Sequence, residues 1–298
     1  MKNFANRVAV ITGAASGFGR EFANTGARLG MKLVLADVQQ EGLDKAIAEL
    51  KAQGASVVGM RCDVSKGDEV EALAKLAIDS YGGVNLLFNN AGVGCGGLVW
   101  ENSVRDWEWV LGVNVWGVIH GVRVFTPLML AQAKVEADYE GHIINTSSMA
   151  GLLNPQLLGA YNVSKHAVVS LSETLFHDLN AVHAKVGCSV LCPAFVPTGI
   201  STSHRTRPQD LQNDSSPTES MKVAQAMTHK AVSSGKLTAA DVAQITFDAI
   251  RDNRFYILTH PKIRATVQMR LDDIAALQNP RDPFALKEEN RPKLDPAA

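Results

Sequence analysis

The sequence predicts an α/β fold in which a parallel sheet of about seven strands carries helices on both faces. Short runs of β-branched and aliphatic residues alternate with stretches whose apolar residues recur at helical spacing. A glycine-rich turn follows the first such run, and polar or glycine-rich segments follow several later ones. Alternating strands and helices are typical of parallel sheets, because the crossover between two parallel strands usually contains a helix.

The composition favours a protein that acts on small molecules. The 298 residues are 46% hydrophobic and 20% charged, with a formal net charge of −1, so no basic excess suggests a nucleic acid or an anionic membrane as partner. No signal peptide is visible, and the longest apolar stretch, 115–130, contains His120 and Arg123. The four cysteines lack metal-ligand spacing. We therefore expect a cytoplasmic protein with no membrane segment and no metal site.

The first strand and the turn after it predict a dinucleotide site. Residues 7–12 (RVAVIT) have a buried-strand pattern and lead into the turn GAASGFG and a helical stretch. Thr12, Gly13, Gly17 and Gly19 give the spacing T-G-x-x-x-G-x-G. Glycines let the backbone approach a diphosphate, and the following helix N-terminus offers free N–H groups and a positive dipole end. A turn that needs glycine for geometry alone is the alternative.

A carboxylate at the end of the second strand indicates which cofactor binds. Asp37 ends the run KLVLADVQQ, and Val38 and Gln39 follow it rather than a basic residue. A carboxylate at this position fits the free 2′-hydroxyl of the NAD ribose and repels the 2′-phosphate of NADP. The expected cofactor is NAD.

The next elements continue the alternation. We expect a capping box of Ser65 with Asp68 at the start of the helix that ends at Tyr81. The following strand ends in the glycine-rich segment NNAGVGCGG, and nucleotides bind at strand ends in doubly wound sheets. The predicted elements are a helix over 42–53, strands over 56–61 and 85–89, and a helical region over 103–132.

Asn114 lies among apolar residues in that last helical region, where a buried amide is costly unless it is hydrogen-bonded. Its partner can be structural or catalytic. Further along, the polar stretch 200–220 is too long and hydrophilic for a core connection, so we expect a mobile lid or flexible loop. Thr238 with Asp241 should cap a helix that ends at Asp252. The other elements are strands over 142–147, 186–192 and 254–259 and helices over 222–234 and 262–277.

These elements fit a doubly wound, Rossmann-like domain over residues 1–261. Residues 199–236 form its lid region, and residues 262–298 add a C-terminal helix and an extended tail.

Three polar side chains form the candidate reaction centre. Tyr161 and Lys165 lie four residues apart at the start of a helical pattern, so their side chains share one helix face at roughly 5–6 Å between Cβ atoms. The ammonium should lower the pKa of the phenol and make it a proton shuttle for an alcohol hydroxyl. Ser148, after the strand-like run HIINTSS, can hydrogen-bond the same substrate oxygen. A surface Tyr–Lys pair is the alternative.

Taken together, these features resemble the short-chain dehydrogenase/reductase family over about residues 5–260. The resemblance rests on TGAASGFG, Asp37, Asp63, NNAG, Asn114, Ser148, YNVSK and PAFVPT, in family order. It implies that Tyr161 is the acid/base, that Lys165 tunes it and binds the nicotinamide ribose, and that Ser148 orients the substrate oxygen. It also implies that Asn114 holds a water that connects Lys165 to solvent.

The resemblance further implies the cofactor contacts. Asp63 would contact the adenine, Asn90 would support the ribose region, and Val196 and Thr198 would hold the carboxamide end. Ala194 stands where the family usually has glycine after Pro193, which should shift the nicotinamide pocket slightly. The full expected set is Gly13, Ser16, Gly17, Phe18, Gly19, Asp37, Val38, Cys62, Asp63, Val64, Asn90, Ala91, Gly92, Tyr161, Lys165, Pro193, Val196 and Thr198.

The implied reaction is the NAD-dependent interconversion of a secondary alcohol and a ketone. Segments that match the family's pocket walls supply Leu98, Met149, Leu158 and Phe195, which favours a bulky apolar or aromatic substrate. The cluster His204, Arg205 and Arg207 can bind a carboxylate, although solvation of an exposed loop is favoured. Two alternatives stay open: an NADPH-dependent ketone or oxoacyl reductase of the same family, and a non-catalytic NAD-sensing protein. Family members form homodimers or homotetramers, which we expect here.

Overall fold

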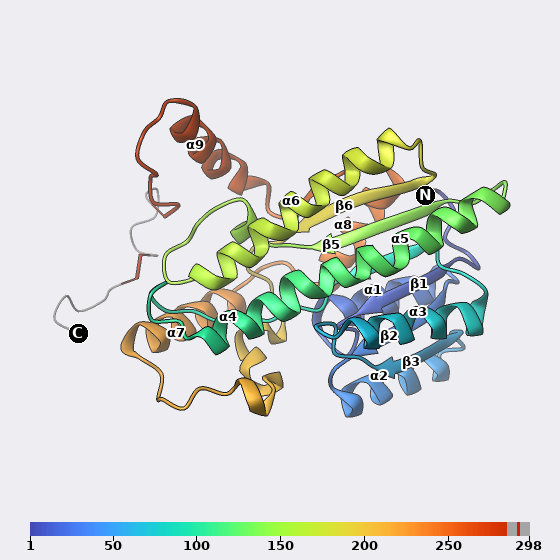
Figure 1. Ribbon diagram of the computed structural model, residues 1–298, viewed down its shortest axis with the longest axis horizontal. Helices are drawn as coiled ribbons and strands as arrows, with labels where there is room; N and C mark the ends of the chain where they lie inside the picture. The colour runs from blue at the N-terminus through green and yellow to red at the C-terminus, as the bar shows by residue number, and fades with distance from the viewer. Residues whose placement is uncertain (285–290, 293–298) are drawn as a thin grey trace.

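A single seven-stranded parallel sheet forms the centre of the protein in the computed structural model, which describes residues 1–284 and 291–292 (Figure 1). The strand order is β3-β2-β1-β4-β5-β6-β7. The fold class predicted from the sequence is confirmed. The strands are β1 (Val8–Thr12), β2 (Lys32–Asp37), β3 (Val57–Arg61), β4 (Leu86–Asn89), β5 (Gly141–Thr146), β6 (Val186–Cys192) and β7 (Tyr256–Leu258).

Helices cover both faces of the sheet (Figure 1). One face packs against α1 (Gly17–Arg28), α2 (Gln40–Ala52) and α8 (Ala239–Arg251), and the other against α3 (Gly67–Tyr81), α5 (Gly117–Val135) and α6 (Gly159–Ala181). Three more helices lie towards one end of the sheet or beyond it: α4 (Val104–Leu111), α7 (Glu219–Ser233) and α9 (Arg264–Ala275).

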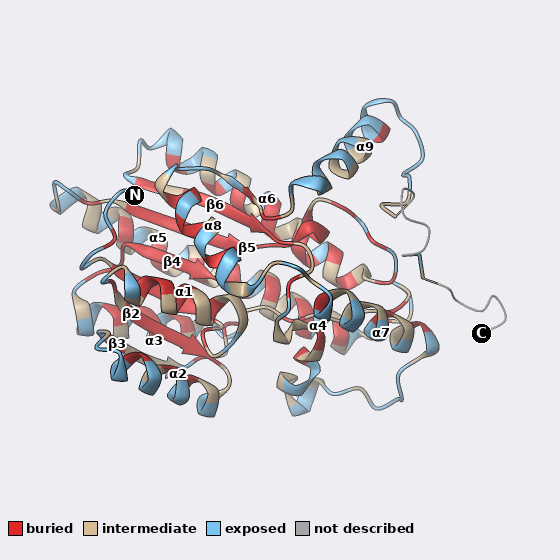
Figure 2. Ribbon diagram, turned by 180° about the vertical axis from the view of Figure 1, so that it is seen from behind, coloured by how far each residue is buried: buried red, intermediate tan, exposed pale blue. Residues whose placement is uncertain are grey.

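The alternation of side chains along β1 explains why both faces are buried. Ala9 and Ile11 point into the core beneath α1 and α8, whereas Val8 and Val10 point into the core beneath α3 and α5. Figure 2 shows the resulting pattern, with buried strands between helices whose outer faces are exposed. A strand that is apolar on both faces needs a helix layer on each, which is the arrangement found.

The strand order reverses between β1 and β4, and this reversal positions the site. Val10 of β1 pairs with Val34 of β2 on one side and with Leu87 of β4 on the other. Because the crossovers leave in opposite directions from these two strands, a crevice opens at their carboxyl ends. The glycine-rich turn after β1 and the NNAG segment after β4 meet at this crevice.

The two predicted capping boxes have different outcomes. Thr238 and Asp241 form the expected box at the start of α8. The box of Ser65 with Asp68 is wrong, because the N-cap residue of α3 is Lys66 and it makes no side-chain cap bond. The Ser65 hydroxyl instead donates to Asp63 Oδ1 at 2.8 Å, so the local turn after β3 uses the hydrogen bond that the helix would have used.

Among the described residues, one helical run, Val104–Val135, is long and apolar enough to cross a membrane by length and composition. The run comprises α4, a π-helical segment (Gly112–Trp116) and α5. Its buried residues include Phe125 and Met129, which belong to the core beneath α3 and α5. The fold buries 39% of the most apolar stretch of this run.

The chain after β7 continues into α9, which stands apart from the sheet and is largely exposed (Figures 1 and 2). The predicted helix over 262–277 is present over a slightly shorter range, after a 3-10 turn at Pro261–Ile263. Much of the predicted extended tail, 285–290 and 293–298, lies outside the described residues.

Candidate active site

One large pocket, which we call the main pocket, opens at the carboxyl ends of the strands. It is lined by the turn after β1 and by segments that follow β2, β3, β4, β5 and β6. Of the predicted cofactor residues, only Gly19 is absent from its lining. The others are Gly13, Ser16, Gly17, Phe18, Asp37, Val38, Cys62, Asp63, Val64, Asn90, Ala91, Gly92, Tyr161, Lys165, Pro193, Val196 and Thr198.

The glycine-rich turn needs glycine for steric reasons. Gly13 has a φ of +65°, and a Cβ atom there would lie 2.9 Å from Ala91 Cα. The turn ends at Ser16, which is the N-cap residue of α1 and makes no side-chain cap bond. The first backbone N–H groups of α1 therefore face the pocket beside Gly17, in the arrangement that binds diphosphates. The residues present fit a dinucleotide.

Gly19 acts behind the turn and does not line the pocket. A Cβ atom there would lie 2.1 Å from the Gly13 carbonyl oxygen, so any side chain requires the backbone of the turn or of α1 to shift. We expect Gly19→Ala to weaken NADH binding at least 10-fold, or to lower the melting temperature by several degrees, because backbone must move. Titration calorimetry and thermal melting measure both effects.

Gly26→Ala, on the same helix, is the matched control. A Cβ atom there first meets Leu33 Cδ2 at 3.0 Å, the end of a side chain that can shift. This variant should bind NADH like the wild type. Unchanged NADH binding and melting in Gly19→Ala would show that the turn tolerates a side chain.

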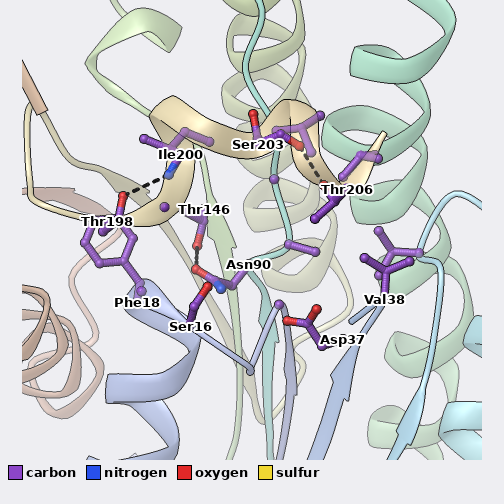
Figure 3. Close-up of a pocket in the computed structure, with 18 of the residues that line it drawn as sticks. Ser16, Phe18, Asp37, Val38, Asn90, Thr146, Thr198, Ile200, Ser203 and Thr206 are labelled. Carbon is purple, nitrogen blue, oxygen red and sulfur yellow. Dashed lines mark hydrogen bonds between the residues drawn. The ribbon is translucent and has the colours of Figure 1, made fainter. Parts of the chain in front are cut away.

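Asp37 is held rigidly at the edge of the pocket. Its Oδ2 accepts a hydrogen bond from the Ala15 amide at 2.9 Å, and its Oδ1 accepts one from the Gln39 amide at 2.9 Å. Figure 3 shows the carboxylate at the end of β2, next to Val38. Backbone amides thus orient both oxygens. The residues that directly follow Ala15, Asp37 and Gln39 carry no positive charge. The site suits a ribose with free hydroxyls.

The ends of β1, β4 and β5 are joined by polar side chains. The Thr12 hydroxyl accepts from the backbone amides of Asn90 and Ala91, at 2.9 and 3.1 Å. The side chain of Asn90 donates from Nδ2 to the Thr12 carbonyl at 3.0 Å, and its Oδ1 accepts from the Thr146 hydroxyl at 3.3 Å. Figure 3 shows Asn90 and Thr146 connected in this way. Asn90 therefore fixes the floor of the pocket between the two halves of the sheet.

Tyr161 and Lys165 lie on one face of the first turns of α6, as their spacing predicts. Lys165 Nζ is 5.6 Å from the centre of the Tyr161 ring and donates to the Thr146 carbonyl at 3.1 Å. Lys165 is 3% exposed, and this burial lowers the pKa of its side chain to about 8. Lys165 is therefore buried and Tyr161 is partly buried, so the pair is not a solvated surface contact.

The expected lowering of the Tyr161 pKa is wrong. Burial raises the pKa of Tyr161, and a hydrogen bond with the Ser148 side chain offsets this only in part. The Ser148 hydroxyl also accepts from the Ala150 amide at 3.1 Å, at the start of a 3-10 turn (Met149–Gly151). The sequence pattern gives the neighbouring ammonium but not the depth of burial, and desolvation is the larger influence.

Asn114 occupies the π-helical segment between α4 and α5. Its side chain accepts from the Val93 amide at 2.8 Å and donates to the Val93 carbonyl at 2.9 Å and to the Ser164 hydroxyl at 3.0 Å. It therefore connects the segment after β4 to α6. A Cβ atom on Gly92 would lie 3.4 Å from Asn114 Oδ1 and 3.5 Å from Lys165 Nζ, so Gly92 separates the two polar groups.

The segment after β6 covers the main pocket and contains short 3-10 helices, where we expected a mobile lid or a flexible loop. Residues Gly199–Thr206 form 3-10 turns, and the Ser203 hydroxyl donates to the Gly94 carbonyl at 3.2 Å. Figure 3 shows Thr198, Ile200, Ser203 and Thr206 along this segment above the pocket. The local structure differs from an irregular loop, because polar contacts with distant segments hold these turns in place, and the role of residues 199–236 as a lid stays a prediction.

Arg207 also departs from the solvated loop favoured by the sequence. Its guanidinium donates to Asp106 Oδ1 at 2.6 Å, and the two side chains are 10% and 5% exposed. The guanidinium also lies 5.1 Å from the centre of the Trp109 ring. Asp106 comes from α4, so this ion pair attaches the segment to the far wall of the pocket. Sequence spacing gives no signal for a pair this distant.

A second pocket adjoins the main pocket. Met149, Leu158 and Phe195 line it as predicted, but Leu98 does not line either pocket. The backbone amide of Leu98 instead donates to the Ser220 hydroxyl at 2.9 Å, which positions the start of α7. The sequence did not predict that α7 forms one wall of the second pocket. The helical spacing of Ala224, Thr228 and Val232 does place these three residues on one face of the helix.

Ser148 and Tyr161 line both pockets. Their hydroxyl groups therefore lie where a molecule in the second pocket meets one in the main pocket. Among residues 1–284, no group of three or more histidine, cysteine, aspartate or glutamate side chains could hold a metal ion.

The fold and this site define a dinucleotide-binding α/β oxidoreductase. A family model for short chain dehydrogenases matches residues 7–209. A crystal structure of a short-chain dehydrogenase/reductase from Burkholderia phymatum in complex with NAD is 57% identical, with a TM-score of 0.93, over 96% of this chain and 100% of the other. The chain belongs to the short-chain dehydrogenase/reductase family.

Two curated relatives match most of the chain. A CLA biosynthesis dehydrogenase/reductase from Lactiplantibacillus plantarum is 34% identical over 92% of this chain and 95% of its own. A C alpha-dehydrogenase from Sphingobium sp. is 31% identical over 94% of this chain and 90% of its own. The protein is therefore an oxidoreductase of a family whose members bind small-molecule substrates.

Proposed function

We propose that the protein is an NAD-dependent dehydrogenase that interconverts a secondary alcohol and a ketone. The observation that carries the proposal is the position of the Ser148 and Tyr161 hydroxyl groups at the junction of the two pockets, with Lys165 buried beside them. NAD, when bound in the main pocket, supplies the hydride acceptor. The NAD complex of the Burkholderia phymatum relative supports this choice of cofactor.

In this mechanism the protein positions the alcohol and moves its proton. Ser148 orients the substrate oxygen, and Tyr161 accepts the hydroxyl proton during oxidation and returns it during reduction. Lys165 binds the nicotinamide ribose and supplies positive charge next to the phenol. Asn114 supports this group by holding α6 to the segment after β4. The apolar lining supplied by Met149, Leu158 and Phe195 supports a bulky apolar or aromatic substrate.

A panel of secondary alcohols with NAD, followed by NADH absorbance, tests the proposal. We expect turnover of apolar and aromatic carbinols. The non-catalytic NAD-sensing alternative predicts NADH binding with no turnover of any alcohol or ketone.

We also propose a homodimer or homotetramer in the cytoplasm, and sedimentation of the purified protein measures the oligomeric state.

The alternative of an NADPH-dependent reductase is tested through Asp37. We expect the wild type to bind NADH at least 10-fold more tightly than NADPH, because a fixed carboxylate repels a 2′-phosphate. Asp37→Asn should weaken NADH binding about 10-fold and strengthen NADPH binding, since it removes a charged hydrogen-bond acceptor.

Asp44→Asn on α2 is the control, because its exposed side chain only accepts a hydrogen bond from Gln40. Fluorescence titration gives the dissociation constants. Tighter binding of NADPH than NADH by the wild type would favour the reductase alternative.

A further inference from the structure

The second pocket contains no charged side chain among the described residues that line it. Its polar groups are hydroxyls, a thiol and one amide. Burial raises the pKa of the Cys95 thiol to about 12, so this thiol is also uncharged near neutral pH. The lining consists of Gly94, Cys95, Gly96, Ser148, Met149, Ala150, Pro155, Leu158, Tyr161, Ala194, Phe195, Ile200, Ser201, Ala224, Gln225, Thr228 and Val232.

The cations near this pocket have other partners. On α7, Lys222 lies 3.7 Å from a Glu219 carboxylate oxygen, and the ring of His229 hydrogen-bonds the Ser201 hydroxyl at 3.3 Å. Lys165 is buried beside the main pocket, where its ammonium donates to the Thr146 carbonyl. Arg205 donates to the Thr202 hydroxyl at 2.6 Å, and Arg207 is paired with Asp106. An anionic group in the second pocket would therefore lose its hydration without gaining a counter-ion from the pocket lining, which disfavours its binding.

Helix α7 forms one wall of the second pocket and contributes a hydroxyl group to it. Ala224, Thr228 and Val232 lie one turn apart on the face that lines the pocket. The amide nitrogen of Gln225 donates to the Ser201 carbonyl, which holds α7 against the segment after β6. The Thr228 hydroxyl has no hydrogen-bond partner within residues 1–284, although the side chain is half-buried. It is free to bind a group of the substrate.

We infer that the substrate is an uncharged, largely apolar secondary alcohol or ketone that carries a second uncharged oxygen function, and that the Thr228 hydroxyl binds this function. The inference rests on the proposed function, since it concerns the molecule that reacts at Ser148 and Tyr161. Molecules that must place a charged group in the second pocket should be poor substrates. They include carboxylates, phosphate esters and acyl groups on charged carriers.

A matched pair of compounds tests the exclusion of charge. Methyl 4-(1-hydroxyethyl)benzoate and its free carboxylate differ only in the charge at the end remote from the carbinol. We expect kcat/KM for the ester to exceed that for the carboxylate at least 100-fold, the ratio expected from about 3 kcal/mol of unpaired charge burial. Equal or faster turnover of the carboxylate would overturn the inference.

Binding supplies a readout that does not depend on turnover. Methyl 4-acetylbenzoate and 4-acetylbenzoate are titrated into the Tyr161→Phe protein with NADH bound. The ester should bind at least 100-fold more tightly. Tighter binding of the carboxylate, or no binding of the ester, would contradict the inference even if other alcohols are oxidised. Failure of NADH binding itself would instead contradict the proposed function.

Two substitutions test the role of Thr228. Thr228→Val should lower kcat/KM about 10-fold for the ester and leave it unchanged for 1-phenylethanol, which lacks the second oxygen. Thr228→Arg should reverse the preference towards the carboxylate, because it supplies the missing counter-ion. Ala226→Arg places the same charge on an exposed position of α7 outside the pocket lining and should leave the preference unchanged. Equal effects of the two arginine variants, or no effect of Thr228→Val, would remove Thr228 from substrate binding.

Discussion

Tyr161→Phe should lower kcat for alcohol oxidation at least 10³-fold while NADH binding changes less than about 3-fold. The substitution removes the hydroxyl that accepts the substrate proton and keeps the ring that lines both pockets. Steady-state kinetics and NADH titration measure the two effects. Tyr256→Phe is the matched control, because the Tyr256 hydroxyl bonds Glu173 on the exposed surface, away from both pockets. Full activity in Tyr161→Phe would remove this residue from the mechanism.

The pH dependence of the wild type adds a second readout for Tyr161. Oxidation needs the deprotonated phenol, and burial raises the pKa of Tyr161. The phenolate fraction therefore increases with pH throughout the neutral range, so kcat/KM for oxidation should rise with pH while that for ketone reduction should not. The residual activity of Tyr161→Phe should lack this rise. A falling oxidation rate would show that another group controls the proton.

Lys165→Met should abolish most activity and stabilise the fold at neutral pH. We expect kcat to fall at least 100-fold, because the positive charge beside the phenol is lost. The same charge is costly to the folded protein, since burial lowers the pKa of Lys165 from 10.5 to about 8. The folded chain thus releases this proton at a lower pH than the unfolded chain, and the difference corresponds to about 3 kcal/mol.

The sign of this effect fixes how the stability gain depends on pH. Below about pH 8 both states carry the proton, and the buried charge lowers wild-type stability by its full amount. Between about pH 8 and 10.5 the unfolded chain binds more protons, so the contribution of Lys165 becomes less unfavourable as pH rises. The melting temperature of Lys165→Met should exceed that of the wild type most at pH 7, and the gap should narrow towards pH 10.

The control is Lys75→Met, which removes an exposed ion pair with Asp79 and should change the free energy of unfolding by less than about 0.5 kcal/mol. A destabilised Lys165→Met protein would contradict this account.

Local signals in the sequence were sufficient for most of the fold. The strand Val186–Cys192 has the predicted bounds, because a short run of mostly small and apolar residues between a turn and a proline allows few alternatives. The cap of Thr238 and Asp241 was predictable because both residues lie within one helical turn. The strand ends placed Asp37, Asn90 and Ser148 at one edge of the sheet, and the structure brings them to the same pocket.

Contacts between distant segments account for what the sequence did not predict. The ion pair of Arg207 with Asp106 holds the polar stretch after β6 over the main pocket. No local sequence pattern predicts this ion pair. The π-helical turn that carries Asn114 depends on the Val93 backbone and the Ser164 hydroxyl, which come from other elements. The direction of the Tyr161 pKa shift depends on burial, which spacing along one helix cannot give.

Transfer of deuterium from the carbinol carbon tests the central claim most directly. The wild type is incubated with NAD and 1-phenylethanol that carries deuterium on the carbinol carbon, and the NADH formed is analysed by mass spectrometry. We expect the NADH to carry the deuterium, with Tyr161→Phe forming less than about one thousandth as much while still binding NADH. Unlabelled NADH, or equal labelling by the variant, would contradict direct transfer at a centre organised by Tyr161.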